Sequence, residues 1–228
     1  MPVVKFEHVS VRYDDTDVLT DINLALTERR IGIIGANGGG KSTLVRLING
    51  LGHPTEGRVL IDDLDVDRHG KQARRKVGFV FSDAENQIVM PLVRDDVAFS
   101  LRRLKLTKQE RDQRVDAALE RFGLAGLADH SPHTLSGGQK QMLALAAVTV
   151  IDPEIIIADE PTTLLDLRNR EKMRREFEGL SQQLIVVSHD LDFLRDFDRV
   201  LCIDDHRVVA DGAPAEIIDY YTRLMEQP

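Results

Sequence analysis

The chain has 228 residues, 42% of them hydrophobic and 30% charged, which is an ordinary composition for one α/β domain or for a core with an inserted subdomain. Its 30 basic and 38 acidic side chains give a formal charge of -8, which excludes a general attraction to nucleic acid or anionic lipid and leaves room only for a local basic patch. The single cysteine, Cys202, excludes an intramolecular disulfide framework and suits a reducing compartment, and its apolar neighbours predict a buried strand.

Targeting and membrane-spanning segments are absent from the sequence pattern. Residues 1–30 carry charges throughout and lack the continuous apolar stretch of a signal peptide. The longest nearly apolar run, residues 142–151, is about half of what a helix needs to cross a bilayer. We therefore expect a cytoplasmic chain whose membrane role, if any, comes through a partner.

Alternating segments near the amino end predict a small antiparallel sheet. Residues 3–13 and 18–27 alternate apolar and polar side chains, as half-buried strands do, and an Asp-Asp turn at 14–15 lies between them. A further strand is expected around residues 57–61. These three segments form the predicted antiparallel patch.

Three other segments predict a parallel sheet covered on both faces. Residues 31–34, 155–158 and 184–187 are short and almost wholly apolar. Each runs into glycine or polar residues at its carboxyl end: Gly35, then residues 159–160, then residues 188–189. Ligands of open parallel sheets bind just outside these ends, so the three clusters are expected to share one crevice.

The middle of the chain is predicted to be helical. Thr107 and Glu110 fit a capping box that opens a helix ending near Phe122, and a second helix follows Ser136 and contains residues 139–150. A hairpin around residues 204–206 and a helix from Pro214 are expected to finish the chain. The predicted division is a core at about 1–83 and 147–205, a helical subdomain at about 84–146, and a short hairpin and helix at 206–228.

A glycine-rich loop between the first apolar segment and a helical pattern matches the phosphate-binding P-loop, G-x-x-x-x-G-K-[ST]. It consists of Gly35, Ala36, Asn37, Gly38, Gly39, Gly40, Lys41, Ser42 and Thr43. Glycines let backbone N–H groups curl around an anion, and the helix amino end adds donors and a positive dipole. Lys41 is expected to reach the β- and γ-phosphates, and the Ser42 hydroxyl to ligate Mg²⁺. A bare flexible glycine turn is the alternative reading.

Two carboxylates follow the second apolar segment. Asp159 is predicted to hold the Mg²⁺ shell, as the Walker-B acid does in P-loop enzymes. Glu160, one residue later, is predicted to orient or deprotonate the attacking water. Taken alone, two acids at a strand end are more often simply solvated, so this interpretation depends on the P-loop.

A second glycine loop, 23 residues before Asp159, carries the family resemblance. It consists of Leu135, Ser136, Gly137, Gly138 and Gln139. This sequence resembles the signature motif of ABC ATPases, although a serine and glycines could also serve only as a helix cap. The resemblance covers nearly the whole chain. It implies an α/β fold with a P-loop (RecA-like) parallel-sheet core, an antiparallel β patch and an inserted helical subdomain, and ATP with Mg²⁺ as ligands.

The resemblance also assigns roles to single residues that would otherwise be read as structural. Tyr13 stands where the family stacks an aromatic ring on adenine. Asp166 resembles the D-loop aspartate, and His189 resembles the switch histidine that contacts the γ-phosphate. The family implies a head-to-tail dimer, in which the loop from Ser136 to Gln139 of one subunit closes over the ATP on the other. A homodimer is the expectation, and a heterodimer stays open.

Three segments indicate the subfamily: residues 77–87, 94–99 and 135–145. Their sequences resemble those of the ATPases in energy-coupling-factor importers, which take up vitamins and transition metals. The resemblance implies a transmembrane coupling protein and a substrate-binding membrane protein as partners. It also implies a peripheral location on the cytoplasmic face of the bacterial inner membrane. The short carboxyl end resembles biotin importers more than cobalt ones, so biotin leads as cargo and cobalt, nickel or another cargo stays open.

One position departs from the family pattern. Ser82 occupies the place of a glutamine that approaches Mg²⁺, and Gln87 matches a second glutamine common in this group. Gln87 is therefore a candidate metal ligand, and a water in the gap or the absence of this contact are the alternatives. Acidic residues on both sides of this segment are expected to dock arginines of the membrane partner: Asp83, Glu85, Asp95 and Asp96. A solvated acidic face is the alternative.

Two other functions compete with transport. A non-transport ABC protein acting on DNA or ribosomes would need coiled coils or a second cassette, and the chain has neither, so no nucleic-acid partner is expected. A degenerate subunit that binds ATP without hydrolysing it conflicts with intact Lys41, Asp159, Glu160 and His189.

Overall fold

The computed structural model describes residues 1–226. The strands are β1 (Val4–Tyr13), β2 (Thr16–Leu26), β3 (Arg30–Gly35), β4 (Glu56–Ile61), β5 (Leu64–Asp65), β6 (Val77–Val80), β7 (Ile155–Asp159), β8 (Gln183–Val187), β9 (Arg199–Asp204) and β10 (Arg207–Gly212). The α-helices are α1 (Lys41–Ile48), α2 (Gly70–Lys76), α3 (Val93–Ser100), α4 (Lys108–Arg121), α5 (Gly137–Thr149), α6 (Leu167–Glu178), α7 (Leu191–Leu194) and α8 (Pro214–Met225). Short 3-10 turns are η1 (Ala84–Asn86), η2 (Leu101–Arg103), η3 (Ala125–Leu127) and η4 (Pro132–Thr134).

The amino-terminal strands form the predicted antiparallel sheet, in the order β2-β1-β4-β5. β1 pairs with β2 and with β4, so that Phe6 lies between Leu24 and Val59. The alternation that predicted these strands places Val4, Phe6 and Val9 in the core and leaves their neighbours half-buried or exposed. The prediction of an antiparallel patch is confirmed.

The second sheet has six strands in the order β10-β9-β3-β8-β7-β6, and all are parallel except β10. The three predicted parallel strands are the adjacent β3, β8 and β7, and every residue of β7 and β8 is buried. The sheet also contains β6, which the sequence pattern did not single out, and β9, which carries the buried Cys202. The carboxyl ends of β3, β7 and β8 therefore meet at one edge, as predicted.

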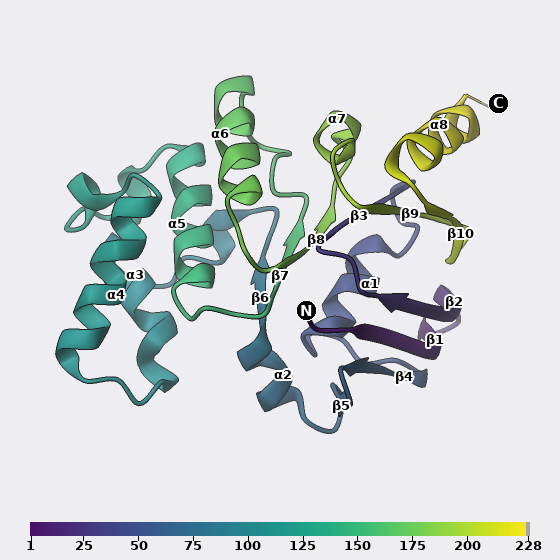
Figure 1. The fold of residues 1–228 in the computed structure, drawn as a ribbon, viewed down its shortest axis with the longest axis horizontal. Coiled ribbons are helices and arrows are strands. Elements are labelled where there is room, and N and C mark those ends of the chain that lie inside the picture. The colour runs from purple at the N-terminus through teal and green to yellow at the C-terminus, as the bar shows by residue number, and fades with distance from the viewer. Residues whose placement is uncertain (227–228) are drawn as a thin grey trace.

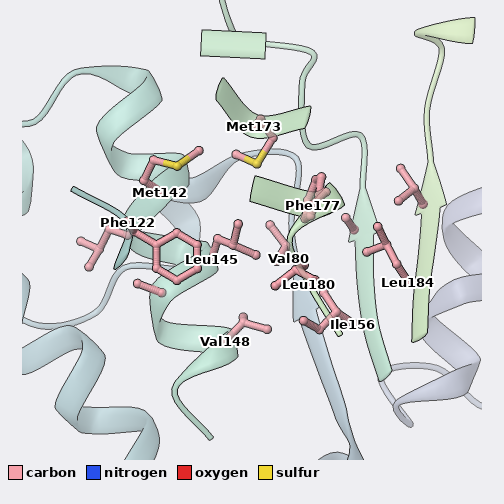
Figure 2. Packing of buried hydrophobic residues seen from close by; sticks show 14 of the residues in the cluster. Val80, Phe122, Met142, Leu145, Val148, Ile156, Met173, Phe177, Leu180 and Leu184 are labelled. Carbon is pink, nitrogen blue, oxygen red and sulfur yellow. The ribbon is translucent and has the colours of Figure 1, made fainter. Parts of the chain in front are cut away.

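Burial on both faces divides the core in two. Ile155 and Ile157 of β7 pack with the antiparallel sheet and α1, whereas Ile156 and Ala158 face the helices on the other side. Figure 2 shows Ile156 in this second layer, together with Met142 of α5 and Phe177 of α6. In Figure 1, α3, α4 and α5 gather at one end of the molecule, while the antiparallel sheet and α8 lie at the other.

Two helices, α4 and α8, begin where the sequence predicted. Thr107 and Glu110 form the predicted capping box at α4, with reciprocal hydrogen bonds of 3.2 and 2.7 Å. α8 begins at Pro214, as expected, and the hairpin between β9 and β10 turns at residues 205–206. The end of the predicted 206–228 segment, residues 227–228, lies outside the described residues. Across residues 1–226, no helix is both long enough and apolar enough to span a membrane.

Candidate functional site

A tight loop connects β3 to α1, and two of its glycines are required by geometry. Gly35 (φ +148°) and Gly40 (φ +98°) adopt backbone angles that side chains rarely tolerate. A Cβ on Gly35 would overlap the carbonyl oxygen of Ile203, and one on Gly40 would overlap that of Val18. The loop therefore packs closely between β9 and β2, and these contacts fix its conformation ahead of α1. Its exposed tip, Asn37 and Gly38, leaves the loop open to solvent.

Lys41 is the first residue of α1, and its side chain is buried inside this loop. Its ammonium donates to the carbonyl oxygens of Gly35 and Ala36, both at 2.9 Å. Burial lowers the pKa of Lys41, and the nearby carboxylates of Glu160 and Asp159 oppose that shift. The charge is therefore held within the loop by two carbonyls, which an anion could replace.

Ser42 and Asp159 come together from segments far apart in sequence. Ser42 Oγ, in the first turn of α1, donates to Asp159 Oδ1 at 2.9 Å. The other oxygen of this buried carboxylate lies 3.6 Å from the guanidinium of Arg46, one turn further along α1. Sequence reasoning missed Arg46, since only the pairing of α1 with the end of β7 brings it to the site. A hydroxyl beside a carboxylate at the mouth of a phosphate loop suits Mg²⁺.

Glu160 sits directly after β7 in a left-handed backbone conformation, with φ +53°. Its N–H donates to the carbonyl of Val187 on β8, and Thr163 Oγ1 donates to its Oε2 at 3.0 Å. A non-glycine residue in this conformation is strained, and such strain gathers at functional sites. The ends of β7 and β8 therefore hold the Glu160 carboxylate at the edge of the sheet.

His189, after β8, meets Glu160. Its backbone N–H donates to Glu160 Oε2 at 3.3 Å, and its Nε2 lies 3.3 Å from Glu160 Oε1. That second approach lacks hydrogen-bond geometry, so buried Oε1 has no donor within residues 1–226. A cleft of about 750 Å³ opens beside these two residues and is bordered by Thr162, Arg170 and Thr222.

Tyr13 ends β1 with 57% of its surface exposed. It pairs with Thr16, and Val18, two residues further along β2, places its carbonyl against Gly40. The hairpin therefore holds an exposed aromatic ring on the segment that flanks the phosphate loop. The exposed ring is therefore available to stack on a planar ligand.

The loop from Ser136 to Gln139 opens α5 as a second capping box. Ser136 Oγ accepts from the Gln139 N–H at 3.3 Å, and Gln139 Oε1 accepts from the Ser136 N–H at 2.8 Å. Ser136 and Gly137 are exposed, and within residues 1–226 no hydrogen bond or ion pair joins them to the phosphate loop. The chain does not bring its two glycine loops together.

Asp166 caps α6, since its carboxylate accepts from the Asn169 N–H at 2.8 Å. The Asn169 side chain lies against Gly138, where a Cβ would overlap it. The residue that resembles the D-loop aspartate and the second glycine loop are therefore linked through the first turn of α6. Asp166 is exposed, as are Ser136 and Gly137 of the loop.

Gln87 does not behave as a free metal ligand in this structure. Its Nε2 donates to the carbonyl of Phe79 and its Oε1 accepts from the Phe81 N–H, both at 3.2 Å. Gln141 of α5 donates to the carbonyl of Phe81 at the same distance. The two amides clamp the end of β6, and Ser82 follows as an exposed side chain.

The expected acidic docking face needs correction at one of its four positions, Asp96. Asp96 is buried and accepts hydrogen bonds from the N–H groups of Val89 and Met90, at 2.8 and 3.0 Å. Glu85 is ion-paired with Lys140 of α5. Asp83 caps η1 through the Glu85 N–H. Three of these four acids thus hold this segment together, which a count of charges along the sequence could not reveal.

A parallel sheet with a glycine loop before α1, a lysine inside that loop and two carboxylates at a neighbouring strand end defines a P-loop nucleotide hydrolase. Residues 19–163 match the ABC transporter domain family. An ABC transporter ATP-binding protein of Bartonella henselae is 51% identical over 225 residues, covering 99% of this chain and 100% of the relative. The biotin transport ATP-binding protein BioM of Rhizobium etli is 44% identical over 221 residues, covering 97% and 98%.

The solved structure of CbiO1 from Clostridium perfringens, part of the ABC transporter complex CbiONQ, superposes with a TM-score of 0.84 at 34% identity, covering 97% of this chain and 93% of that one. The chain therefore belongs to the ABC transporter family and is an ATP-hydrolysing subunit. The predicted fold class and the predicted resemblance to energy-coupling-factor ATPases are confirmed.

Proposed function

We propose that the chain binds Mg²⁺-ATP at the edge where β3, β7 and β8 end, and hydrolyses it to drive an energy-coupling-factor importer. The observation that carries this proposal is the convergence of Lys41, Ser42, Asp159 and Glu160 at that edge. The residues fit the ligand: the loop has no room for a Cβ at Gly35 or Gly40, and the ammonium of Lys41 donates to two carbonyls that phosphate oxygens can replace.

We assign each of these residues a role in ATP binding or hydrolysis. Lys41 binds the β- and γ-phosphates, while Ser42 and Asp159 hold Mg²⁺. When bound, Mg²⁺ neutralises charge on the phosphate oxygens. Glu160 accepts a proton from the attacking water at Oε1, the oxygen without a donor. We assign His189, whose Nε2 stands 3.3 Å from that oxygen, to the contact with the γ-phosphate.

A second copy of the chain completes the site. The N–H groups at the start of α5 form an anion-binding helix end that this chain does not turn toward its own phosphate loop. We assign Ser136, Gly137, Gly138 and Gln139 to the ATP bound by the partner, and Asp166 to the same interface. Tyr13 stacks on the adenine of its own subunit, for which its exposed ring is available.

The names of two relatives support the proposal of membrane partners. One carries the name biotin transport ATP-binding protein, and another is part of the CbiONQ complex. We assign this chain to the cytoplasmic face of the inner membrane, beneath a transmembrane coupling protein and a substrate-binding membrane protein, with the segment 84–146 as the helical subdomain. Biotin is the proposed cargo, supported by the name of the Rhizobium etli relative, and a cobalt or nickel ion or another cargo is the alternative.

The direct test of hydrolysis is phosphate release by the purified chain with Mg²⁺, compared with the same chain in excess chelator. We expect turnover only with the metal. The cargo is tested by uptake of labelled biotin and of labelled Co²⁺ in cells with and without the chain. Loss of Co²⁺ uptake alone would replace biotin by the metal while leaving the ATPase assignment intact.

A further inference from the structure

Arg46 of α1 lies beside the carboxylate that is proposed to hold Mg²⁺. It follows Ser42 by four residues, so the two side chains lie on the same face of the helix. Ser42 Oγ donates to Asp159 Oδ1 at 2.9 Å, while a guanidinium nitrogen of Arg46 lies 3.6 Å from Asp159 Oδ2. One helix face therefore supplies a hydroxyl to one oxygen of this carboxylate and a positive charge to the other.

The two partners of this contact differ in burial. The Asp159 side chain is 5% exposed, whereas the Arg46 side chain is 48% exposed. Asp159 is the only acid paired with Arg46 within residues 1–226, and at 3.6 Å the contact is longer than a hydrogen bond. The carboxylate is thus fixed in place, while the guanidinium can move out toward solvent without breaking another ion pair.

A buried carboxylate is costly unless a positive charge compensates it. Lys41, another cation near Asp159, directs its ammonium to the carbonyls of Gly35 and Ala36. Arg46 is therefore the cation that pairs with Asp159 in the chain without metal. A divalent cation on the same carboxylate would take over this compensation and would repel the guanidinium.

We propose that Arg46 is a positioning residue that takes the place of the metal: it holds the Asp159 carboxylate before Mg²⁺ binds, and it lowers the affinity of the site for Mg²⁺ by competing for that carboxylate. The inference rests on the proposed Mg²⁺ site of Ser42 and Asp159. A guanidinium that instead bound a phosphate of the nucleotide would strengthen nucleotide binding even without metal. The two roles therefore differ in what happens when Mg²⁺ is removed.

The test is equilibrium binding of fluorescent ADP to the purified full chain, in excess chelator and at saturating Mg²⁺. ADP has no γ-phosphate to lose, so the measurement reports binding alone. We expect Arg46→Gln to keep the Kd in chelator within about twofold and to lower the Kd at saturating Mg²⁺ about fivefold, the scale of a half-exposed charge pair. Arg46→Lys, which keeps the charge, should behave like the unmodified chain. The matched control Arg58→Gln breaks an exposed pair with Glu7 and should change neither Kd.

Thermal unfolding of the same variants gives a second measurement. In chelator and without nucleotide, Arg46→Gln should unfold about 2–4 °C below Arg58→Gln, because the buried Asp159 carboxylate loses its counter-charge. Saturating Mg²⁺-ADP should shrink that difference, since the metal then compensates the carboxylate.

Three results would overturn the role of Arg46. An unchanged or higher Kd at saturating Mg²⁺ in Arg46→Gln would show that the arginine does not compete with the metal. A Kd in chelator that rises severalfold would make Arg46 a phosphate ligand. Equal shifts in Arg58→Gln would show that net charge decides. A different result, equal ADP binding by the unmodified chain with and without Mg²⁺, would overturn the proposed metal site itself and this inference with it.

Discussion

The hydroxyl of Ser42 donates a 2.9 Å hydrogen bond to the carboxylate of Asp159, and this bond joins the first turn of α1 to the end of β7. The two residues are 117 positions apart in sequence. Because Glu160 is the next residue along, the same strand end fixes both the proposed metal-holding acid and the proposed base. The proposed roles therefore separate ATP binding, assigned to α1, from hydrolysis, assigned to the residue after β7.

Replacing Glu160 with glutamine should remove hydrolysis and keep ATP binding. The side chain retains its shape and its bond from Thr163, while the proton acceptor is lost. Loss of a positioned base costs about 10²–10⁴ in rate. Phosphate release and nucleotide binding by fluorescence check the two effects separately. Lys41→Ala should instead weaken binding, and Glu120→Gln, an exposed change on α4, should alter neither. Hydrolysis by Glu160→Gln at the unmodified rate would remove Glu160 from the mechanism.

Asp96 should prove structural. Asp96→Ala removes the acceptor of the Val89 and Met90 N–H groups, and each lost hydrogen bond costs about 0.5–1.5 kcal/mol. Burial raises the pKa of Asp96, so the neutral isostere in Asp96→Asn, which keeps the accepting oxygen, should cost much less. Thermal or denaturant unfolding of the two variants gives the comparison. If both unfold like the unmodified chain, these hydrogen bonds do not hold the segment.

Cys202 should resist thiol reagents in the folded chain. Burial in β9 raises the pKa of its thiol to about 11. The reactive species is the thiolate, and at pH 8 only about one such thiol in a thousand is ionised. Ellman's reagent should therefore react slowly with the native protein and at once after unfolding in guanidinium chloride. Raising the pH toward 11 should speed the native reaction. Rapid labelling of the native chain at pH 8 would show that β9 opens or that the thiol is ionised.

The sequence was sufficient for the features whose physics is local. The P-loop, the alternation of β1 and β2, and the caps at Thr107 and Ser136 each depend on neighbours within a few residues. β6 was missed as a strand because only four residues form it and its pairing with β7 is long-range. α6 was missed because most of its residues are charged, and only two residues of the helix, Met173 and Phe177, are buried against the core.

The contacts within the candidate site were harder to predict. Arg46 reaches Asp159 only because α1 packs beside the end of β7, and no spacing in the sequence signals that. Gln87 matches a family position, yet its amide is taken up by the main chain of β6. The acidic cluster looked like a docking face because charge is visible in a sequence, whereas the burial of Asp96 is not.

Ser82→Gln should raise the ATPase rate of the isolated chain. Ser82 is exposed after the clamped end of β6, and a serine is shorter than the family's glutamine by roughly two to three bonds, a gap that a bridging water can fill. We expect low activity in the isolated chain, stimulation by the membrane subunits, and weaker dependence on them in the variant. Steady-state ATPase assays of both forms, with and without those subunits, measure this. A lower isolated rate with unchanged stimulation would show that the serine is not a shortened glutamine.

The central claim is that a second copy of this chain completes each ATP site through the loop at Ser136. Light scattering during size exclusion, in the Glu160→Gln background with Mg²⁺-ATP, tests it most directly. The chain mass is 25.6 kDa, so we predict a dimer of about twice that mass with ATP, a monomer without it, and a monomer with ATP when Ser136→Arg is added. Lys140→Ala, just beyond the loop, serves as the control that should still dimerise. A dimer that persists in the Ser136→Arg variant, or one that forms without ATP, would contradict the account.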